Sequence, residues 1–335
     1  MMDPDISVII PVKNGGAVFE ECLAALRASP RVRYEIIILD DCSTDNSKAI
    51  ASNYSCRLVE LPCSVGHSTT RNRGAQMARG EILFFIDADI IVRPDTIQKV
   101  SDIFQNKDVV AITGVLSEDI RYGNFSSRYK NFWMRYTYLR MPDRVSLFYT
   151  SVAAIRRELF LQTGGFDTAY KRPSVEDTDF GQRLEMMGGS VHLKRNLEVE
   201  HVKYYSLGGL LKTDFFRSAD MIKMTLRKGL RQFLVRGNKT SVRTSFIVGV
   251  GLYCIVLMSI LVGIFFPSML NLSIVLSGIF IVSIYFLNRS FLRWLAVRGG
   301  WWLLMQAFFF IVLDLSVVVV GVFYGVVDYV CGHRY

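Results

Sequence analysis

Three short acidic clusters stand in the first part of the chain: Asp40-Asp41, Asp87-Ala88-Asp89 and Glu176-Asp177-Thr178-Asp179. The second cluster directly follows an apolar run at 82–86, which places two carboxylates at the end of an expected buried strand. Carboxylates of this kind hold Mg²⁺ or Mn²⁺ and leave coordination positions for substrate phosphates. The pattern therefore predicts metal-assisted chemistry on an anionic substrate.

The other two clusters each have a structural alternative. Ser43 or Thr44 could cap a helix after Asp40-Asp41, but two aspartates exceed what a cap needs, and a carboxylate there can accept the N3–H of uracil. The cluster at 176–179 opens a helical pattern, where acidic residues also complement the helix dipole. A glycine-rich turn at 164–167 lies just upstream and would hold a loop facing the same cleft.

The elements that must position these residues follow from periodicity. Apolar runs at 6–10, 35–39, 57–61, 82–86 and 109–113 alternate with helical patterns at 18–28, 43–54, 68–78 and 96–104. This alternation predicts an α/β fold with a doubly wound, mainly parallel sheet, whose ligands bind beyond the carboxyl ends of its strands. The dinucleotide fingerprint and the P-loop are missing after the first strand, which disfavours hydride transfer and ATP hydrolysis.

The composition changes near Arg243. Apolar runs at 246–266, 269–287 and 303–327 are each long enough to cross a hydrocarbon core of about 30 Å, and we expect three transmembrane helices. The alternative is a set of buried helices in a soluble domain. Basic residues precede the first run and recur between the second and third, so the positive-inside rule predicts a cytoplasmic N-terminal domain and a C-terminus on the opposite side.

The net charge of +9 gathers next to these apolar runs, which favours anionic lipid over nucleic acid as a partner. Residues 208–236 mix apolar and basic side chains at helical spacing and predict amphipathic interfacial helices, or else ordinary surface helices. Asp314 in the third run could contact a lipid carrier, a partner subunit or water. Gly321 and Gly325 form a GxxxG pattern, so the third transmembrane helix could support a homo-oligomer.

An ordered set of motifs covers about residues 5 to 205. The motifs are SVIIPVKN, ILDDCSTDNS, TRNRGAQMARGE, FFIDADI, TGGFD and EDTDFGQRL, followed by His201. Together they resemble the family 2 GT-A glycosyltransferases, which are inverting enzymes that use nucleotide-diphosphate sugars. The resemblance implies a UDP-sugar or related donor, one divalent metal (Mg²⁺ or Mn²⁺), and transfer by single displacement.

The resemblance also implies roles for individual residues. Asp177 would be the general base. The donor side would be formed by Pro11, Lys13, Asn14, Asp41, Arg71 and Asp87. The metal would be held by Asp89 and His201, although a structural role for this histidine is an open alternative. The acceptor side would be formed by Gly165, Phe166, Asp167 and Glu176.

Two positions depart from the family pattern. Cys42 replaces a glycine or small polar residue, which leaves the local turn geometry open. The QxxRW motif of processive synthases is not matched at 232–237, which favours addition of a single sugar.

The sequence thus predicts three regions: a glycosyltransferase domain at 1–205, interfacial helices at 206–243 and a multi-pass membrane region at 244–335. The expected activity is transfer of one sugar to a hydroxyl of a lipid or lipid-linked glycan at the cytoplasmic leaflet. One alternative is a polyprenyl-phosphate glycosyltransferase. A second alternative is a non-catalytic membrane assembly subunit.

Overall fold

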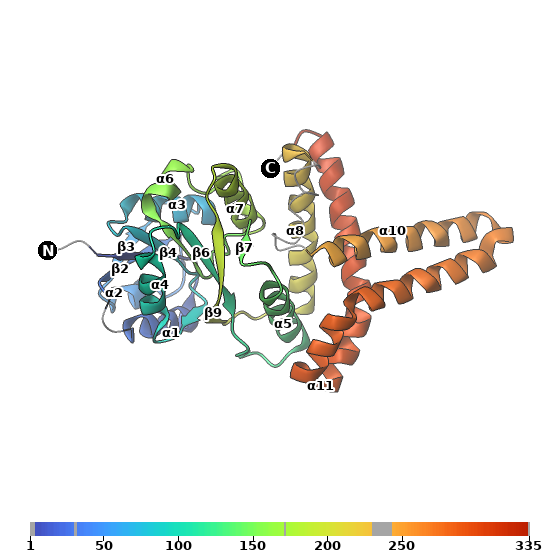
Figure 1. The fold of residues 1–335 in the computed structure, drawn as a ribbon, viewed down its shortest axis with the longest axis horizontal. Helices are drawn as coiled ribbons and strands as arrows, with labels where there is room; N and C mark the ends of the chain where they lie inside the picture. Colours follow the sequence, from blue (N-terminus) through green and yellow to red (C-terminus); the bar gives the residue numbers. More distant parts are fainter. Residues whose placement is uncertain (1–3, 30–31, 171, 230–242, 334–335) are drawn as a thin grey trace. The chain divides into compact units, whose positions relative to one another are not determined.

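A computed structural model describes residues 4–29, 32–170, 172–229 and 243–333. These residues form two compact units (Figure 1). The first contains described residues 4–122 and 138–204, and the second contains 123–137, 205–229 and 243–333. The segment 123–137, expected in the catalytic domain, therefore belongs to the second unit.

The first unit is built on one mixed sheet. Its strands follow the order β3-β2-β1-β4-β8-β6-β9-β5, and β7 pairs with β9. The strands are β1 (Ile6–Val12), β2 (Tyr34–Asp40), β3 (Arg57–Glu60), β4 (Ile82–Phe85), β5 (Ile90–Val92), β6 (Ala111–Leu116), β7 (Arg144–Val145), β8 (Ala153–Arg156) and β9 (Val191–His201).

We expected a mainly parallel sheet, but only part of the observed sheet is parallel. Strands β3, β2, β1 and β4 are parallel neighbours, and β6 runs parallel to β9. The pairs β4–β8, β6–β8, β5–β9 and β7–β9 are antiparallel. The alternating pattern predicted the parallel part, because its strands are joined in order by helices, whereas β8 and β9 pair across long stretches of sequence.

Helices cover both faces of the sheet (Figure 1). They are α1 (Gly16–Arg27), α2 (Ser47–Ser52), α3 (His67–Met77), α4 (Thr96–Gln105), α6 (Arg157–Gln162) and α7 (Glu176–Met186). The chain passes from β1 to β2 to β3 in one direction and then returns past them to β4. Right-handed crossovers therefore put α1 and α2 on one face and α3 on the other.

The core of the first unit lies on both sides of the parallel strands. Every residue of β1 and β4 is buried, as expected for strands covered by helices on both faces. On one side, five phenylalanine rings pack together with neighbouring centroids 5.0 to 6.2 Å apart. They are Phe85, Phe148, Phe160, Phe166 and Phe180. This cluster fixes β4 against α6 and α7.

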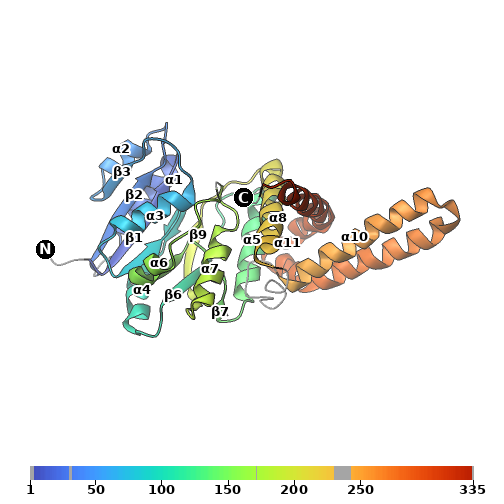
Figure 2. The same ribbon diagram turned by 90° about the horizontal axis from the view of Figure 1, so that it is seen from above.

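The second unit is helical. It contains most of α5 (Phe125–Leu139), together with α8 (Leu207–Lys228), α10 (Thr244–Phe265), the short 3-10 helix η2 (Pro267–Met269) and α11 (Leu270–Val330). Helix α10 and the first part of α11 run side by side as a hairpin (Figures 1 and 2). Tyr253 of α10 packs with Ile284, Ile311 and Leu315 of α11.

Two helices in the described residues are long and apolar enough to cross a membrane, at 244–265 and 267–330, rather than three separate ones. Only 22% and 33% of the residues in their most apolar stretches are buried, unlike those of a soluble protein's core helix. The second and third expected spans both lie in α11, which is helical throughout except at Gly300 (φ 81°, ψ 172°). The basic residues between the two runs do not end the helix, because its backbone hydrogen bonds do not require apolar side chains.

Helix α8 is one continuous helix, and the remainder of the expected interfacial region, together with the 232–237 segment, lies outside the described residues. The GxxxG face of α11 packs against α8. A Cβ atom at Gly321 would lie 2.5 Å from the carbonyl oxygen of Phe215, and one at Gly325 would lie 2.5 Å from that of Ala219. The GxxxG face is therefore covered by α8 of the same chain, and a homo-oligomer through this helix stays a prediction.

Candidate active site

The ends of β1 and β2 hold the first group of expected site residues. Asp41 accepts hydrogen bonds from the Ser64 hydroxyl and the Val65 amide, both at 2.7 Å. The Lys13 ammonium donates to the same Ser64 oxygen at 3.0 Å. Pro11 is buried within β1, opposite Leu39 of β2. Asp41 and Lys13 are thus joined through one serine, while Pro11 contributes to the sheet.

Two residues at these strand ends have left-handed backbone conformations: Asn14 (φ 55°) and Cys42 (φ 62°). This conformation costs a non-glycine residue about 1 to 2 kcal/mol, and strained positions of this kind concentrate at functional sites. The Asn14 side chain accepts a hydrogen bond from the Thr44 amide at 2.8 Å, which fixes the turn. Cys42 thus adopts a positive φ, which glycine adopts with less strain.

Asp87, at the end of β4, is held by two partners. Its Oδ1 pairs with Nη2 of Arg71 at 2.6 Å, and its Oδ2 accepts a hydrogen bond from the Ser151 hydroxyl at 2.7 Å. Burial alone would raise the pKa of Asp87, but the Arg71 guanidinium and the Ser151 hydroxyl outweigh it and hold the pKa well below its usual range. Asp87 is therefore a fixed anion.

Asp89 and His201 meet because β5 and β9 are antiparallel. Ile90 stands opposite His201, and the Val202 amide donates to the Asp89 carbonyl at 2.8 Å. Oδ2 of Asp89 lies 3.4 Å from Nε2 of His201, and Nδ1 of His201 is buried without a hydrogen-bond partner among the described residues. Burial would raise the pKa of Asp89, but the neighbouring His201 lowers it overall.

This pair fits a divalent cation, although no group of three or more metal-ligating side chains occurs among the described residues. Mg²⁺ binds through one or two protein ligands plus waters and phosphates, at about 2.0 to 2.1 Å. Two adjacent ligands of an octahedral ion are then about 3 Å apart, close to the Asp89–His201 separation.

The acidic run at 176–179 is buried at the start of α7 and is not a solvated helix terminus. Glu176 accepts a hydrogen bond from the Ser174 amide at 2.7 Å and pairs with Nη1 of Arg71 at 3.4 Å. Asp177 is 7% exposed and accepts a hydrogen bond from the Thr178 amide at 2.6 Å. Glu176 is thereby connected through Arg71 to Asp87, which places the two acidic segments at one location.

The glycine-rich turn before α7 has a backbone conformation that favours glycine. Gly164 and Gly165 have φ values of 79° and 69°, and a Cβ atom at Gly165 would lie 2.5 Å from the Asn72 side chain. Asp167 accepts a hydrogen bond from the Ala169 amide at 2.9 Å. Phe166, expected on the acceptor side, is 1% exposed and belongs to the phenylalanine cluster. Its ring is therefore a core element, whereas Asp167 is half-buried.

Three polar residues that contact the expected site were not assigned roles from the sequence: Ser64, Asn72 and Ser151. His67, which lies close enough for its pKa to be affected by Arg71, was not assigned a role either. Both His67 and Asn72 lie on α3, at or near the TRNRGAQMARGE motif. Burial and the nearby Arg71 charge lower the pKa of His67. The serines carry no sequence signal, because a serine near a strand end is common and its partner lies far along the chain.

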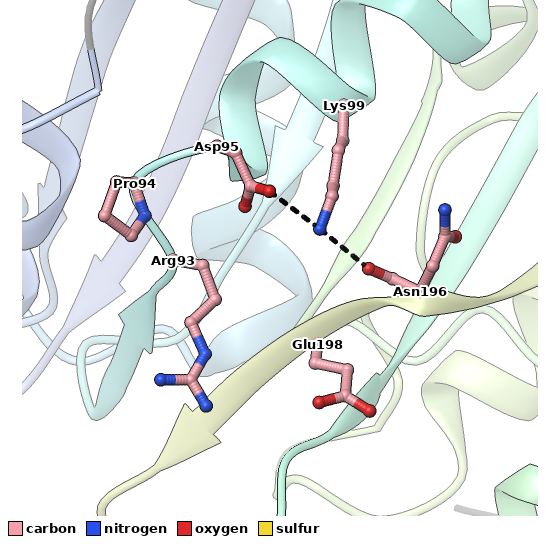
Figure 3. A pocket seen from close by; sticks show the side chains of 6 residues that line it. All are labelled: Arg93, Pro94, Asp95, Lys99, Asn196 and Glu198. Atoms are coloured by element: carbon pink, nitrogen blue, oxygen red, sulfur yellow. Dashed lines mark hydrogen bonds and ion pairs between the residues drawn. The ribbon is translucent and has the colours of Figure 1, made fainter.

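A separate surface pocket of about 520 Å³ lies at the opposite end of β5 from Asp89 (Figure 3). Lys99 in this pocket contacts Asp95 at 2.9 Å and the Asn196 carbonyl at 3.1 Å (Figure 3). Arg93 pairs with Asp119. Because these cations already have anionic or carbonyl partners, we do not assign this pocket to the chemistry.

Several known proteins resemble this chain in sequence or in fold. Residues 7–164, just under half of the chain, match the model of glycosyl transferase family 2. The uncharacterized glycosyltransferase YibD of Escherichia coli is 42% identical over 94 residues, which is 27% of each chain. The glycosyltransferase GlyG of Streptococcus pneumoniae is 32% identical over 126 residues, or 36% of this chain and 42% of the relative. The chain thus spans less than half the length of these two relatives.

Among solved structures, the mannosyltransferase PcManGT of Pyrobaculum calidifontis has a similar fold, with a TM-score of 0.58 and 17% identity over 98% of this chain and 88% of that one. Residues 7–164 are therefore similar to glycosyl transferase family 2. The family match and the named relatives support an enzyme of the glycosyltransferase class.

Proposed function

We propose that the protein is a membrane-anchored, inverting glycosyltransferase that transfers one sugar from a nucleotide-diphosphate sugar to a hydroxyl of a lipid or lipid-linked glycan. The observation that carries this proposal is the ion-pair chain from Asp87 through Arg71 to Glu176. It brings the carboxylates at the end of β4 together with the acidic start of α7. A donor-binding region and a candidate base, 90 residues apart in sequence (177 − 87 = 90), thus belong to one site.

The donor side is formed by the strand ends. Asp41 is fixed by Ser64 and Val65, so its carboxylate is held in place to accept the N3–H of a uracil ring. We assign the remaining donor contacts to Lys13, Asn14 and Asp87, and give Pro11 and Arg71 supporting positions. A mannosyltransferase of similar fold was solved with GDP-Man and Mn²⁺, which supports a nucleotide sugar as the donor class.

Asp89 and His201 are the residues that would hold a divalent metal. A metal ion bound there supplies positive charge to the departing diphosphate as a Lewis acid. Asp89 supplies the negative charge that such an ion requires, because an aspartate with a reference pKa of about 3.9 is ionised at pH 7. The unpartnered Nδ1 of His201 leaves the imidazole without a second hydrogen bond among the described residues.

Asp177 is the proposed general base. Inverting transfer needs a group that accepts the proton of the attacking hydroxyl, and no covalent nucleophile is required. With a reference pKa of about 3.9, an aspartate is ionised at pH 7 and can take that proton. Asp177 follows Glu176 directly, so the Arg71 contact to Glu176 also sets the position of the base. The backbone of the turn at Gly165 and Asp167 would face the acceptor.

The acceptor class follows from the second unit. Helices α10 and α11 expose many large apolar side chains, including Phe265 (74% exposed) and Phe309 (69%), an arrangement that suits contact with lipid. Helix α11 has 61 residues, about 90 Å at 1.5 Å per residue, which is far longer than one crossing of about 30 Å. Its break at Gly300 divides it into two segments. We therefore propose three crossings, with the catalytic unit in the cytoplasm and the C-terminus on the opposite side.

A polyprenyl-phosphate glycosyltransferase is the nearest alternative. A phosphate oxygen is already ionised and has less need of a base. The buried acidic start of α7, joined to the donor side through Arg71, favours a hydroxyl acceptor instead. The same complete set of acidic side chains argues against a non-catalytic assembly subunit.

The function is tested by incubating the purified protein in detergent with a panel of radiolabelled donors, UDP-glucose, UDP-galactose, UDP-GlcNAc and GDP-mannose. The acceptor is a membrane lipid extract, and Mn²⁺ is present. We expect one UDP-sugar to label a lipid product, and the Asp177→Asn protein to give none above background. Transfer to a polyprenyl phosphate alone would support the alternative. A wild-type protein that neither binds nor hydrolyses any of the donors would refute the proposal.

A further inference from the structure

Two adjacent residues on α3, Arg71 and Asn72, contact three separate parts of the first unit. Arg71 reaches the end of β4 and the start of α7. Asn72 reaches the turn at 164–167. One turn of a single helix thereby touches the donor-side strand, the helix of the proposed base and the acceptor-side turn.

The Arg71 side chain is 2% exposed and carries an ion pair on each terminal nitrogen: Nη2 contacts Asp87 at 2.6 Å, and Nη1 contacts Glu176 at 3.4 Å. The guanidinium is planar and presents its donors as a rigid fork, so it fixes the two carboxylates relative to each other. Because Ser151 and the Ser174 amide bind the outer oxygens of the two carboxylates, each is held from two sides.

Asn72 makes a reciprocal pair of hydrogen bonds with the backbone of Phe166. Its Nδ2 donates to the Phe166 carbonyl at 2.8 Å, and its Oδ1 accepts from the Phe166 amide at 2.8 Å. Only a side-chain amide supplies one donor and one acceptor in this geometry. Arg183 supports the same turn by donating to the carbonyls of Thr163 and Gly165 at 2.8 and 2.7 Å.

We propose that Arg71 and Asn72 are positioning residues that couple the donor side of the site to its acceptor side. This inference rests on the proposed function and adds a role that neither residue type reveals alone. Arg71 acts through Asp87 and Glu176, and thereby sets the distance between the bound donor and Asp177. Asn72 acts through the turn and sets the backbone that faces the acceptor. A displacement of about 1 Å in such a group can cost about a hundredfold in rate.

Substitutions of the two residues should affect UDP affinity and kcat differently. Asn72→Asp keeps the size of the side chain and its acceptor but loses the donor, and it places a carboxylate against the Phe166 carbonyl. We expect the affinity for UDP in Mn²⁺ to stay within about twofold of wild type, while kcat for transfer falls about 10- to 100-fold. Arg71→Lys keeps the charge but cannot hold both carboxylates, so both UDP affinity and kcat should fall about tenfold or more.

The control is Arg73→Lys, an exposed position on the same helix, which should leave both quantities unchanged. UDP affinity is measured by calorimetry in Mn²⁺, and kcat with the active donor and lipid extract. Circular dichroism and thermal melting establish that each variant is folded. Should Arg71→Lys not fold, Asn72→Asp decides alone.

Equal losses of UDP affinity and kcat in Asn72→Asp would overturn the coupling role, because a general loss of structure produces that result. Wild-type kcat in the same variant would overturn it as well. If the wild-type protein binds no nucleoside diphosphate, the proposed function itself is wrong and this inference fails with it. If wild type transfers sugar but Asn72→Asp shows no separation of UDP affinity from kcat, only the inference fails.

Discussion

The metal assignment can be tested by removing His201, the member of the pair that the chain supplies from the end of β9. His201→Ala leaves Asp89 as the remaining protein ligand. The separation of 3.4 Å between Oδ2 of Asp89 and Nε2 of His201 allows one ion to contact both. Loss of a supporting group at a metal site weakens binding by about 10- to 100-fold. At 1.4 kcal/mol for each tenfold change, this is about 1.4 to 2.8 kcal/mol.

The assay is calorimetric titration of UDP into protein, first in Mn²⁺ and then in EDTA. We expect His201→Ala to lose most of the gain in UDP affinity that Mn²⁺ gives to wild type, and to match wild type in EDTA. The control is His192→Ala, because this histidine lies at the other end of β9 and contacts Ser190 at 3.1 Å. An unchanged response to Mn²⁺ in His201→Ala would show that this histidine is a structural partner of Asp89. A wild-type protein indifferent to EDTA would remove the metal from the proposal.

Three further outcomes are expected. Asp177→Asn should bind UDP like wild type but transfer sugar about 10²- to 10⁴-fold more slowly, and near-normal transfer would mean that the acidic run only begins a helix. Gly325→Ala should lower thermal stability in detergent by about 1 to 3 kcal/mol, because its Cβ would meet the Ala219 carbonyl at 2.5 Å. Gly278→Ala, in the same helix with open space around it, should leave thermal stability unchanged. Equal losses of stability in the two variants would refute the α8–α11 packing. With Cys331 as the sole cysteine, a membrane-impermeant thiol reagent should label intact cells, whereas labelling only after permeabilisation would mean that the C-terminus faces the cytoplasm.

Much of the first half of the sheet follows from the sequence, because local patterns decide it. The runs at 6–10, 35–39, 57–61 and 82–86 correspond to β1, β2, β3 and β4 within a few residues. These strands alternate with helices and are apolar on both faces, a pattern that periodicity detects. The position of Asp87 and Asp89 after β4 follows from the same pattern.

The other half of the sheet could not be read in this way. Strand β9 alternates between buried and half-exposed residues and carries many charges, and its partners β5, β6 and β7 come from distant parts of the chain. The contact between Arg71 and Glu176 joins residues 105 positions apart. Which of many arginines and carboxylates pair is decided by the three-dimensional fold and not by spacing along the chain. The acceptor-side motif stays a prediction, and its Phe166 is buried in the core. The motif alone does not say which way this ring points.

Asp314 shows why a boundary at residue 205 alone does not separate the two units, since segment 123–137 also belongs to the second. The sequence predicted that this residue, which lies in an apolar run, contacts a lipid carrier, a partner subunit or water. In the second unit it is buried beside Asp214 of α8 and Lys130 of α5, and Lys130 pairs with Asp214. Asp314 thus lies within a buried polar group in which Lys130 forms its ion pair with Asp214.

Lys130 comes from α5, a segment that lies between β6 and β7 in the sequence. Tyr129 of α5 also packs its ring against Phe291 and Phe310 of α11, at centroid separations of 5.7 and 4.7 Å. A chain ending at residue 205 would leave Lys130 without Asp214 and Tyr129 without these rings. Because α5 lies between strands of the first unit in sequence but packs in the helical unit, the apolar helices complete the folded structure around α5.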